Sequence, residues 1–345
     1  MNQHGDRDLD LAVLIGRFQP FHLGHLALLK SALGLAPRVV VVVGSARGPR
    51  LAKNPFTVEE RIETIQASLT AEQRACVGFV AIRDYYDEPR WAAAVKAAVA
   101  RETSGPVALV GFRKDDTSAY LSLFPEWREI ALPRQAPIDA TGLRRLYFAT
   151  PGSELTAELV AAVPEPVAEF LRQFRGMPPF EHLREELAAL DANRQTYGSG
   201  PFVTVDAVVT SGKQLLLVQR GHAPGKGLWA LPGGFLEGSE RLLAAAIREL
   251  KEETCLARSE AELHAAFRSV AVFDHPSRSQ RGRTITHAHY FALGAPGNGA
   301  PPTVAGADDA QAARWFPLAD LPAMTSDLFE DHFQIIDHFL NIARD

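Results

Sequence analysis

Short apolar runs alternate with segments of helical spacing in the N-terminal part of the chain, and this alternation restricts the fold more than any other feature. Residues 9–15 are nearly all apolar and lead into Gly16, and a second such run at 38–43 follows a helical pattern at 25–33. Runs of this kind are typical of strands that are buried on both faces of a parallel sheet. A strand, a helix and a second strand in this order form a βαβ unit, so we expect an α/β domain with a mostly parallel sheet.

The alternation continues towards the middle of the chain. Helices are expected at 57–69 and 91–101, and strands at 77–82 and 107–111. The chain has 345 residues, whereas an average domain holds roughly 100–200, so a second domain is expected.

The pattern changes after two groups of glycine and proline, at 176–179 and 198–201, which flank a charged segment of helical spacing at 181–193. Beyond them, two β-rich runs at 202–209 and 214–219 are separated by a hairpin signal, a single long helix is expected at 240–254, and the clearest later strand lies at 284–293. This mixture indicates an α+β domain. The predicted organisation is therefore an N-terminal domain at 1–175, a linker with a helix at 176–200 and a C-terminal domain at 201–345.

The composition excludes several classes of function. With 36 Lys and Arg against 41 Asp and Glu, the net charge of −5 argues against non-specific binding to nucleic acid or to an anionic membrane surface. Cys76 and Cys255 form no CxxC pair, so neither a structural zinc site nor a disulfide framework is expected. No apolar stretch reaches the roughly 18 residues of a membrane span, and the N-terminus has no secretory pattern. We therefore expect a cytoplasmic protein with no membrane or nucleic-acid partner.

The first motif that carries chemistry lies where the first predicted strand meets the first predicted helix. Residues 16–25 read GRFQPFHLGH. The carboxyl end of a parallel strand and the N-terminus of the next helix together form a place where phosphate binds. His22 and His25 are three residues apart, so their imidazoles can point to one side and donate hydrogen bonds to a polyphosphate. The alternative is that they are surface or capping histidines.

Residues 22–25 resemble the (H/T)xGH signature of a nucleotidyltransferase superfamily. Together with residues 44–61, the motif is similar to the archaeal-type nicotinamide mononucleotide (NMN) adenylyltransferases. The resemblance implies a Rossmann-like parallel-sheet domain in which the 5′-phosphate of NMN attacks the α-phosphorus of ATP in line, without a covalent intermediate. It assigns the triphosphate to Arg17, His22, His25 and Arg144, with Mg²⁺ assisting, and it counts His22, His25 and Arg144 as catalytic.

A late motif of the same family has its counterpart at residues 138–144, where Asp139 replaces the usual serine and Thr141 and Arg144 are retained. The resemblance implies that the aromatic face of Trp91 stacks on the nicotinamide ring. The alternative is that Trp91 is a core residue on an amphipathic helix. Arg61 is a weaker match to the family. The predicted ATP- and NMN-binding residues are Gly16, Arg17, Phe18, Gly24, Asn54, Phe56, Trp91 and Thr141.

The second motif, at residues 234–256, reads GFLEGSERLLAAAIRELKEETCL. Helical spacing places Glu249, Glu252 and Glu253 on one patch, where like charges repel one another unless a divalent cation binds between them. Carboxylate oxygens suit Mg²⁺. The alternative is a solvated acidic face, but the preceding Leu-Pro-Gly-Gly at 231–234 and Glu240 at the helix start indicate a site built from a loop and a helix.

This pattern is similar to the Nudix hydrolase signature, GX5EX7REUXEEXGU, at Gly234, Glu240, Arg248 and the three glutamates. Cys255 stands where the family has a glycine that ends the helix. The resemblance implies cleavage of a nucleoside diphosphate linked to another group. Glu249, Glu252 and Glu253 would bind Mg²⁺, for which Mn²⁺ could substitute, and Arg248 would brace a carboxylate. The catalytic base is one of these glutamates or a glutamate elsewhere.

Residues 272–291 resemble Nudix domains that act on ADP-ribose. Arg278, Arg281 and Arg283 could contact phosphate or ribose there, or could be ordinary surface arginines. The order of the two domains matches bifunctional bacterial NMN adenylyltransferase/Nudix hydrolases. The expected partners are therefore ATP, NMN, NAD and ADP-ribose, and a homo-oligomer is compatible with the sequence. Two alternatives remain. In the first, the N-terminal domain adenylylates a different phosphate ester and the C-terminal domain cleaves NADH or another nucleoside diphosphate compound. In the second, the Nudix domain senses a ligand without catalysis.

Overall fold

The structure is a computed structural model that describes residues 9–111, 121–132, 139–150, 152, 154–294 and 300–343. It divides into two compact units, Met1–Arg184 and Glu185–Asp345, which are described separately below. Across the described part of the chain, no helix combines the length and the apolar character needed to cross a bilayer.

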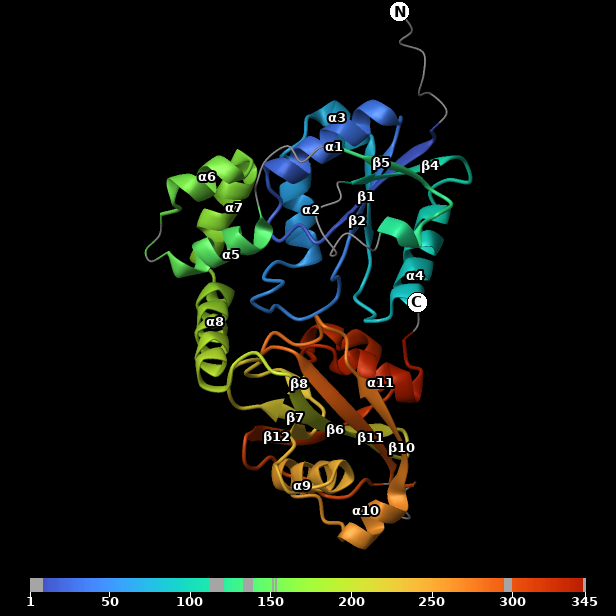
Figure 1. The fold of residues 1–345 in the computed structure, drawn as a ribbon, viewed down its shortest axis with the longest axis vertical. Helices are drawn as coiled ribbons and strands as arrows, with labels where there is room; N and C mark the ends of the chain where they lie inside the picture. The colour runs from blue at the N-terminus through green and yellow to red at the C-terminus, as the bar shows by residue number, and fades with distance from the viewer. Residues whose placement is uncertain are drawn as a thin grey trace, which may run out of the picture. The chain divides into compact units, whose positions relative to one another are not determined.

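The N-terminal unit contains a parallel sheet, as the alternating pattern predicts (Figure 1). The strand order is β3-β2-β1-β4-β5, so the order reverses between β1 and β4. In open sheets of this type, ligands bind at such a reversal, at the carboxyl ends of the strands. The strands are β1 (Leu11–Gly16), β2 (Val39–Val43), β3 (Val77–Ala81), β4 (Val107–Gly111) and β5 (Arg128–Ala131).

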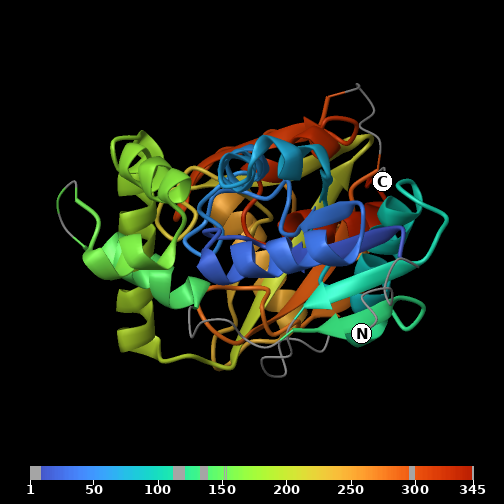
Figure 2. The same ribbon diagram turned by 90° about the horizontal axis from the view of Figure 1, so that it is seen from above.

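Helices cover both faces of this sheet because successive side chains of a strand point to opposite faces. Leu11 and Val13 of β1 pack in one cluster with Val95 and Val99 of α4 (Glu88–Ala100). Helix α1 (Leu23–Leu35) contacts β1, β2 and β4 and lies over the sheet in Figure 2. Both strands of the first βαβ unit are therefore enclosed, which explains their continuous apolar composition. Helices α2 (Val58–Ala67) and α3 (Ala71–Ala75) follow β2.

A group of helices completes the N-terminal unit and leads out of it: α5 (Ala140–Ala149), α6 (Ala157–Ala162), α7 (Glu165–Arg175) and α8 (Pro178–Tyr197). The helix predicted at 181–193 is longer than expected, because α8 already begins at Pro178 within the first group of glycine and proline. Proline is tolerated in the first turn of a helix, where its missing N–H has no partner to lose. Only Gly176 and Met177 separate α7 from α8, and α8 crosses the division between the units.

The C-terminal unit is built on a mixed sheet with the order β10-β11-β6-β7-β12, in which β8 also pairs with β7 and β9 with β6. The predicted hairpin is confirmed, because β6 and β7 are antiparallel and Ser211 lies opposite Gln214 at their turn. The strands are β6 (Phe202–Ser211), β7 (Gln214–Arg220), β8 (Trp229–Ala230), β9 (Gly233–Phe235), β10 (Phe267–Phe273), β11 (Thr284–Ala292) and β12 (Ala310–Pro317).

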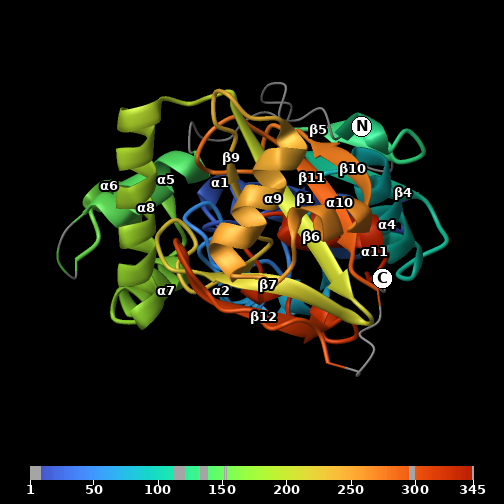
Figure 3. The ribbon, with the colours of Figure 1, turned by 90° about the horizontal axis from the view of Figure 1, so that it is seen from below.

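Helices cover both faces of this sheet too. Ala246 and Leu250 of α9 (Leu242–Thr254) pack in one cluster with inward-facing residues of β6 and β7, and α9 crosses these strands in Figure 3. Ile335 and Ile336 of α11 (His332–Leu340) pack in a second cluster with the alternate residues of the same strands. The remaining described helices are α10 (Glu260–Ala266) and the short 3-10 turns η2 (Leu321–Ala323) and η3 (Thr325–Asp327). The expected helix start at Glu240 is wrong by two residues, since Arg241 precedes the first residue, Leu242.

The residue that departs from the Nudix pattern ends α9 in a left-handed conformation. Cys255 is the C-cap residue, with φ 48° and ψ 29°, and it is exposed. Left-handed backbone costs an L-residue about 1–2 kcal/mol, whereas glycine adopts it freely but loses more entropy on folding. The chain therefore keeps the backbone shape that glycine would provide, at a cost in stability.

We expect Cys255→Gly to stabilise the protein by about 1 kcal/mol, because it removes the left-handed strain and exposes little new surface. The measurement is the shift of the thermal or urea unfolding transition. Cys255→Ala is the matched control, since it removes the thiol but keeps the strained Cβ. A glycine variant that is no more stable than the alanine variant contradicts this account.

Candidate functional site

The two histidines of the first motif lie together at the start of α1. His22 is the N-cap residue, and its Nδ1 accepts a hydrogen bond of 3.3 Å from the backbone N–H of His25. The Nδ1 of His25 accepts one of 3.4 Å from the N–H of His22. The rings stack with their centroids 3.6 Å apart and their planes inclined by 21°. The histidines are therefore capping residues, and the capping itself brings both rings to one side of the helix terminus.

His25 is neutral in this arrangement. Burial, and secondarily the charge of His22, lower the pKa of His25 well below its ordinary value. Because Nδ1 of the neutral ring accepts a hydrogen bond, the proton resides on Nε2. The Nε2–H group is a donor of the kind that an oxygen of a polyphosphate accepts.

Three residues predicted to bind ATP or NMN, Gly16, Phe18 and Gly24, pack around this histidine pair. The ring of Phe18, which is 2% exposed, meets His25 edge to face at 5.0 Å. A Cβ at Gly16 would lie 2.8 Å from the Phe18 ring, and a Cβ at Gly24 would lie 3.1 Å from the imidazole of His22. Packing against Phe18 and His22 therefore leaves little room for a side chain at either glycine, and the predicted role of Gly16 in ATP and NMN binding stays a prediction.

Two buried arginines, Arg61 and Arg144, bind the backbone of the loop at residues 17–21, which joins β1 to α1. Arg144 is 8% exposed; it donates to the carbonyl oxygen of Gln19 at 2.6 Å and to the hydroxyl of Thr141 at 3.2 Å. Arg61 donates to the carbonyl oxygens of Arg17 at 2.8 Å and of Gly44 at 2.7 Å. Arg144 therefore braces the loop, whereas the side chain of Arg17 is exposed and makes no hydrogen bond within the described residues.

Positive charge accumulates at this place. Burial, followed for Arg144 by the charge of Arg17, lowers the pKa of Arg61 and of Arg144 to about 10. The guanidinium groups remain charged at neutral pH, and the charge of Arg17 acts on both of the buried arginines, so an anionic ligand would be attracted to this place.

Gln19 was missed in the sequence analysis, although it joins two loops. Its side chain donates to the carbonyl oxygen of Phe56 at 2.9 Å and accepts from the N–H of Phe56 at 3.0 Å. The ring of Phe56 is 4% exposed and meets Phe170 and Phe174 edge to face. The ring of Phe56 therefore belongs to the packing between its loop and α7, and a contact of Phe56 with ATP or NMN stays a prediction.

The remaining predicted residues of this unit are placed as follows. The Oδ1 atom of Asn54 is buried and accepts no hydrogen bond from the described residues, so a ligand donor would satisfy it. Trp91 is half-buried and meets Phe124 edge to face at 5.8 Å. Asp139 is the N-cap of α5 and accepts from the N–H of Gly142 at 3.1 Å, which is the capping role that a serine fills equally well. Ile138 lies outside the described residues.

In the C-terminal unit, one arginine holds the acidic helix together. Arg248 pairs with Glu240 at 2.7 Å and with both Glu249 and Glu252 at 2.9 Å. The three carboxylates are therefore neutralised partly by the chain itself. Glu253 has no such contact with Arg248 within the described residues.

Glu253 is instead hydrogen-bonded to residues 231–234 (Leu-Pro-Gly-Gly), the glycine loop. It is 8% exposed, and its Oε2 accepts from the N–H of Gly233 at 2.9 Å. Burial raises its pKa to about 8, and the charge of Glu249 adds to this, against the opposing effects of the Gly233 N–H and of Arg220. Burial also raises the pKa of Glu249.

The donor set fits a divalent cation. The buried Glu253 and the half-buried Glu249 have raised pKa values and lie on one helix, so a bound cation would stabilise their charged forms. The described residues contain no preassembled group of three or more ligands, and Glu249 and Glu252 are held by Arg248. The carboxylates are therefore of the type that binds a divalent cation, and Arg248 holds two of them in place.

The two glycines of this loop lie in close contact with neighbouring parts of the chain. A Cβ at Gly234 would lie 2.4 Å from Oε1 of Glu249, and a Cβ at Gly233 would lie 2.2 Å from the carbonyl oxygen of Val205. Backbone atoms of β6 therefore leave no room for a side chain at Gly233, whereas a side chain at Gly234 would displace the carboxylate of Glu249.

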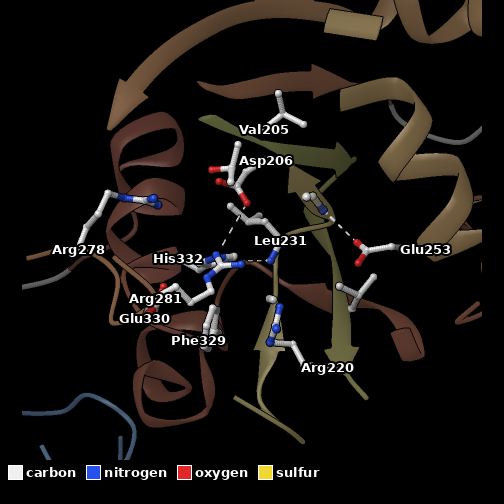
Figure 4. A pocket seen from close by; sticks show the side chains of 15 residues that line it. Val205, Asp206, Arg220, Leu231, Glu253, Arg278, Arg281, Phe329, Glu330 and His332 are labelled. Carbon is white, nitrogen blue, oxygen red and sulfur yellow. Dashed lines mark hydrogen bonds and ion pairs between the residues drawn. The ribbon is translucent and has the colours of Figure 1, made fainter. Parts of the chain in front are cut away.

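A pocket opens beside this loop and Glu253 (Figure 4). Its polar walls come from β6, from the end of β7, and from the segments before and at the start of α11. The charged and aromatic side chains that line it are Asp206, Arg220, Glu253, Arg278, Arg281, Phe329, Glu330 and His332.

The structure separates the three arginines that were predicted as substrate contacts. Arg278 is paired with Asp331 through two hydrogen bonds of 2.8 and 2.9 Å, and both side chains are almost fully buried, so Arg278 is a structural residue. Arg283 is bonded to the carbonyl oxygen of Asp274 and is not among the residues that line the pocket. Arg278 still lines the pocket, so its contact with a substrate stays a prediction, whereas Arg283 lies outside the lining.

Arg281 and a residue that the sequence analysis missed, Arg220, remain in the pocket. The guanidinium of Arg220 lies 4.3 Å from the ring centroid of Phe329, and that of Arg281 lies 5.4 Å from the ring of Phe235. The Nε of Arg281 is buried without a hydrogen-bond partner among the described residues. Arg220 follows an ordinary strand pattern, and no local signal distinguishes it; only strand pairing brings it beside the glycine loop.

Two family models match the chain. The cytidylyltransferase-like model matches residues 13–100, and the NUDIX domain model matches residues 200–339. The nicotinamide/nicotinic acid mononucleotide adenylyltransferase of Acinetobacter baylyi is 37% identical over 187 residues, which are 53% of this chain and 96% of the relative. The ADP-ribose pyrophosphatase of Methanocaldococcus jannaschii is 34% identical over 140 residues, which are 41% of this chain and 73% of the relative.

Solved structures also match almost the whole chain. A bifunctional NMN adenylyltransferase/ADP ribose pyrophosphatase from Francisella tularensis is 33% identical, with a TM-score of 0.89, and covers 96% of this chain and 99% of its own. A second structure of this description from Francisella tularensis, complexed with AMP and a Mn ion, matches with the same values.

Removing the buried partner of Asp331 tests the structural role of Arg278. We expect Arg278→Ala to destabilise the C-terminal unit by about 3–5 kcal/mol, because a carboxylate is left buried without its counter-charge. The measurement is thermal unfolding followed by circular dichroism. Arg283→Ala is the matched control and should change stability by less than about 0.5 kcal/mol. An Arg278→Ala variant of unchanged stability would restore the substrate-contact interpretation.

Proposed function

Because the chain belongs to the family of bifunctional NMN adenylyltransferase/ADP-ribose pyrophosphatase proteins, we propose that it is an enzyme of NAD metabolism with one phosphorus chemistry in each unit. The N-terminal unit transfers AMP from ATP to NMN, giving NAD and pyrophosphate. The C-terminal unit hydrolyses ADP-ribose to AMP and ribose 5-phosphate. ADP-ribose is what remains when NAD loses nicotinamide, so the two activities act on related molecules.

The observation that carries the first activity is the stacked histidine pair at the capped N-terminus of α1. The Nε2–H of neutral His25 and the exposed guanidinium of Arg17 are donors towards the ATP phosphates. Arg144 and Arg61 act through the loop carbonyl oxygens that they hold. In-line transfer between two phosphates requires mainly positioning and charge stabilisation, which these groups supply without a covalent step.

The second activity rests on the carboxylates of α9 beside the pocket. Glu249, Glu252 and Glu253 are the groups that would hold Mg²⁺, or Mn²⁺ in its place. The metal, when bound, neutralises the diphosphate and makes a water a stronger nucleophile. The guanidinium groups of Arg220 and Arg281 line the same pocket as Glu253 and are suited to the substrate phosphates. Arg248 pairs with Glu240 and donates to the carbonyl oxygen of Phe235, which ties α9 to the chain that follows the glycine loop.

The first activity is tested at His25. We expect His25→Ala to lower kcat for NAD formation by about 10²–10³-fold, the usual cost of losing a donor to the developing charge. The measurement is pyrophosphate release from ATP and NMN. Hydrolysis of ADP-ribose by the same variant is the internal control and should be unchanged. If the unaltered protein releases no pyrophosphate with NMN, the proposed first activity is wrong.

The second activity is tested at Glu253. We expect Glu253→Gln to lower the rate of AMP formation from ADP-ribose and Mg²⁺ by at least about 10²-fold, because an uncharged amide is a poor ligand for a hard cation. Glutamine is nearly isosteric and keeps an acceptor for the Gly233 N–H, so folding should be preserved. NAD formation serves as the control. Turnover that is unaffected by this substitution would exclude Glu253 from the reaction.

A further inference from the structure

A buried histidine under the glycine loop has no role in the function proposed above. His332 is the first residue of α11 and is 7% exposed. Its Nδ1 accepts a hydrogen bond of 2.8 Å from the backbone N–H of Leu231, which directly precedes Pro232, Gly233 and Gly234 (Figure 4). The two residues are 101 positions apart in the sequence.

Hydrogen bonds on successive residues hold this loop. The N–H of Leu231 donates to His332, the carbonyl oxygen of Pro232 accepts from the N–H of Ala207 at 2.8 Å, and the N–H of Gly233 donates to Glu253 at 2.9 Å. Proline has no N–H, so Leu231 and Gly233 supply the donors on either side of it. The loop is thus tied to β6, to α9 and, through His332, to α11.

The surroundings of His332 keep its ring in one state. Burial lowers its pKa to about 4, and the charges of Arg278, Arg220 and Arg281 act in the same direction against Asp206. A neutral ring that accepts at Nδ1 carries its proton on Nε2, which lies 4.0 Å from Oδ1 of Asp206. Asp206 is itself fixed by the hydroxyl of Thr286, which donates to its Oδ2. Nδ1 is therefore an acceptor for Leu231 throughout the neutral pH range.

We propose that His332 is a positioning residue of the ADP-ribose-hydrolysing site, which orients the glycine loop so that the N–H of Gly233 meets Glu253 and the carboxylates of α9 stay in place to bind a divalent cation. This inference rests on the proposed function of the C-terminal unit. His332 acts through the backbone of Leu231 and not by contact with the reacting atoms. The lost interaction is one hydrogen bond to a buried backbone donor, whose removal leaves that donor unsatisfied.

The test compares substitutions that keep or remove the acceptor. The side-chain oxygen of His332→Asn can take the position of Nδ1, whereas His332→Leu fills similar space without an acceptor. We expect His332→Leu to lower kcat for ADP-ribose hydrolysis by about 10–100-fold, with KM changed by less than about threefold, and His332→Asn to recover most of this loss. His338→Leu, an exposed histidine on the same helix, is the matched control and should behave like the unaltered protein.

A readout that does not depend on turnover separates this inference from the proposed function. Hydrogen–deuterium exchange of the loop amides and Mn²⁺ binding are measured for the full-length variants without substrate. We expect faster exchange at Leu231 and Gly233 and weaker Mn²⁺ binding in His332→Leu, both restored in His332→Asn. If the unaltered protein does not hydrolyse ADP-ribose but these differences appear, the proposed activity fails and the positioning role stands.

The inference is overturned if His332→Leu exchanges and binds Mn²⁺ like the unaltered protein. It is also overturned if the Asn and Leu variants are equally impaired, because ring volume and not the acceptor would then matter. Should His332→Leu fail to fold, His332→Gln replaces it in the comparison. Its acceptor lies near the position of Nε2 and cannot reach Leu231 from the same rotamer, so only His332→Asn should retain the loop.

Discussion

Groups of like charge that lie close together are the constraint on which both sites depend. In the N-terminal unit, Arg61 and Arg144 are buried near Arg17, and in the C-terminal unit the buried Glu253 lies beside the half-buried Glu249 on one face of α9. Buried like charges destabilise a fold unless each is bonded. Arg61 and Arg144 each donate to backbone carbonyl oxygens. Glu249 pairs with Arg248, and Glu253 accepts from the N–H of Gly233.

These internal bonds also keep each site in a defined geometry before a ligand binds. The reciprocal caps of His22 and His25 use Nδ1 of both rings, which determines the tautomer of neutral His25. The bond between Gly233 and Glu253 ties the glycine loop to α9 in the same way. Binding a polyphosphate or a divalent cation then requires local exchange of partners, and not the assembly of a site from mobile parts.

The departures from the family patterns keep the local geometry with different residues. Asp139 caps α5 in place of serine, because a carboxylate accepts the same backbone N–H. Cys255 adopts the left-handed conformation that glycine favours, at the end of α9. In both cases the backbone shape is preserved while the side chain differs.

The sequence by itself determined the parallel sheet, the hairpin and the two motifs, because these depend on local periodicity and on residues within a few positions of one another. Only the tertiary structure decided which residues support the motifs. Gln19 and Arg144 are bonded across 125 positions, and Leu231 and His332 across 101. The same applies to the arginines of the C-terminal unit: Arg278 pairs with Asp331 across 53 positions, while Arg220 and Arg281 line the pocket. A local pattern shows which side chains are able to take part in chemistry. Their supporting partners lie far away in the sequence and are brought next to them by tertiary packing, which the spacing of neighbouring residues does not reveal.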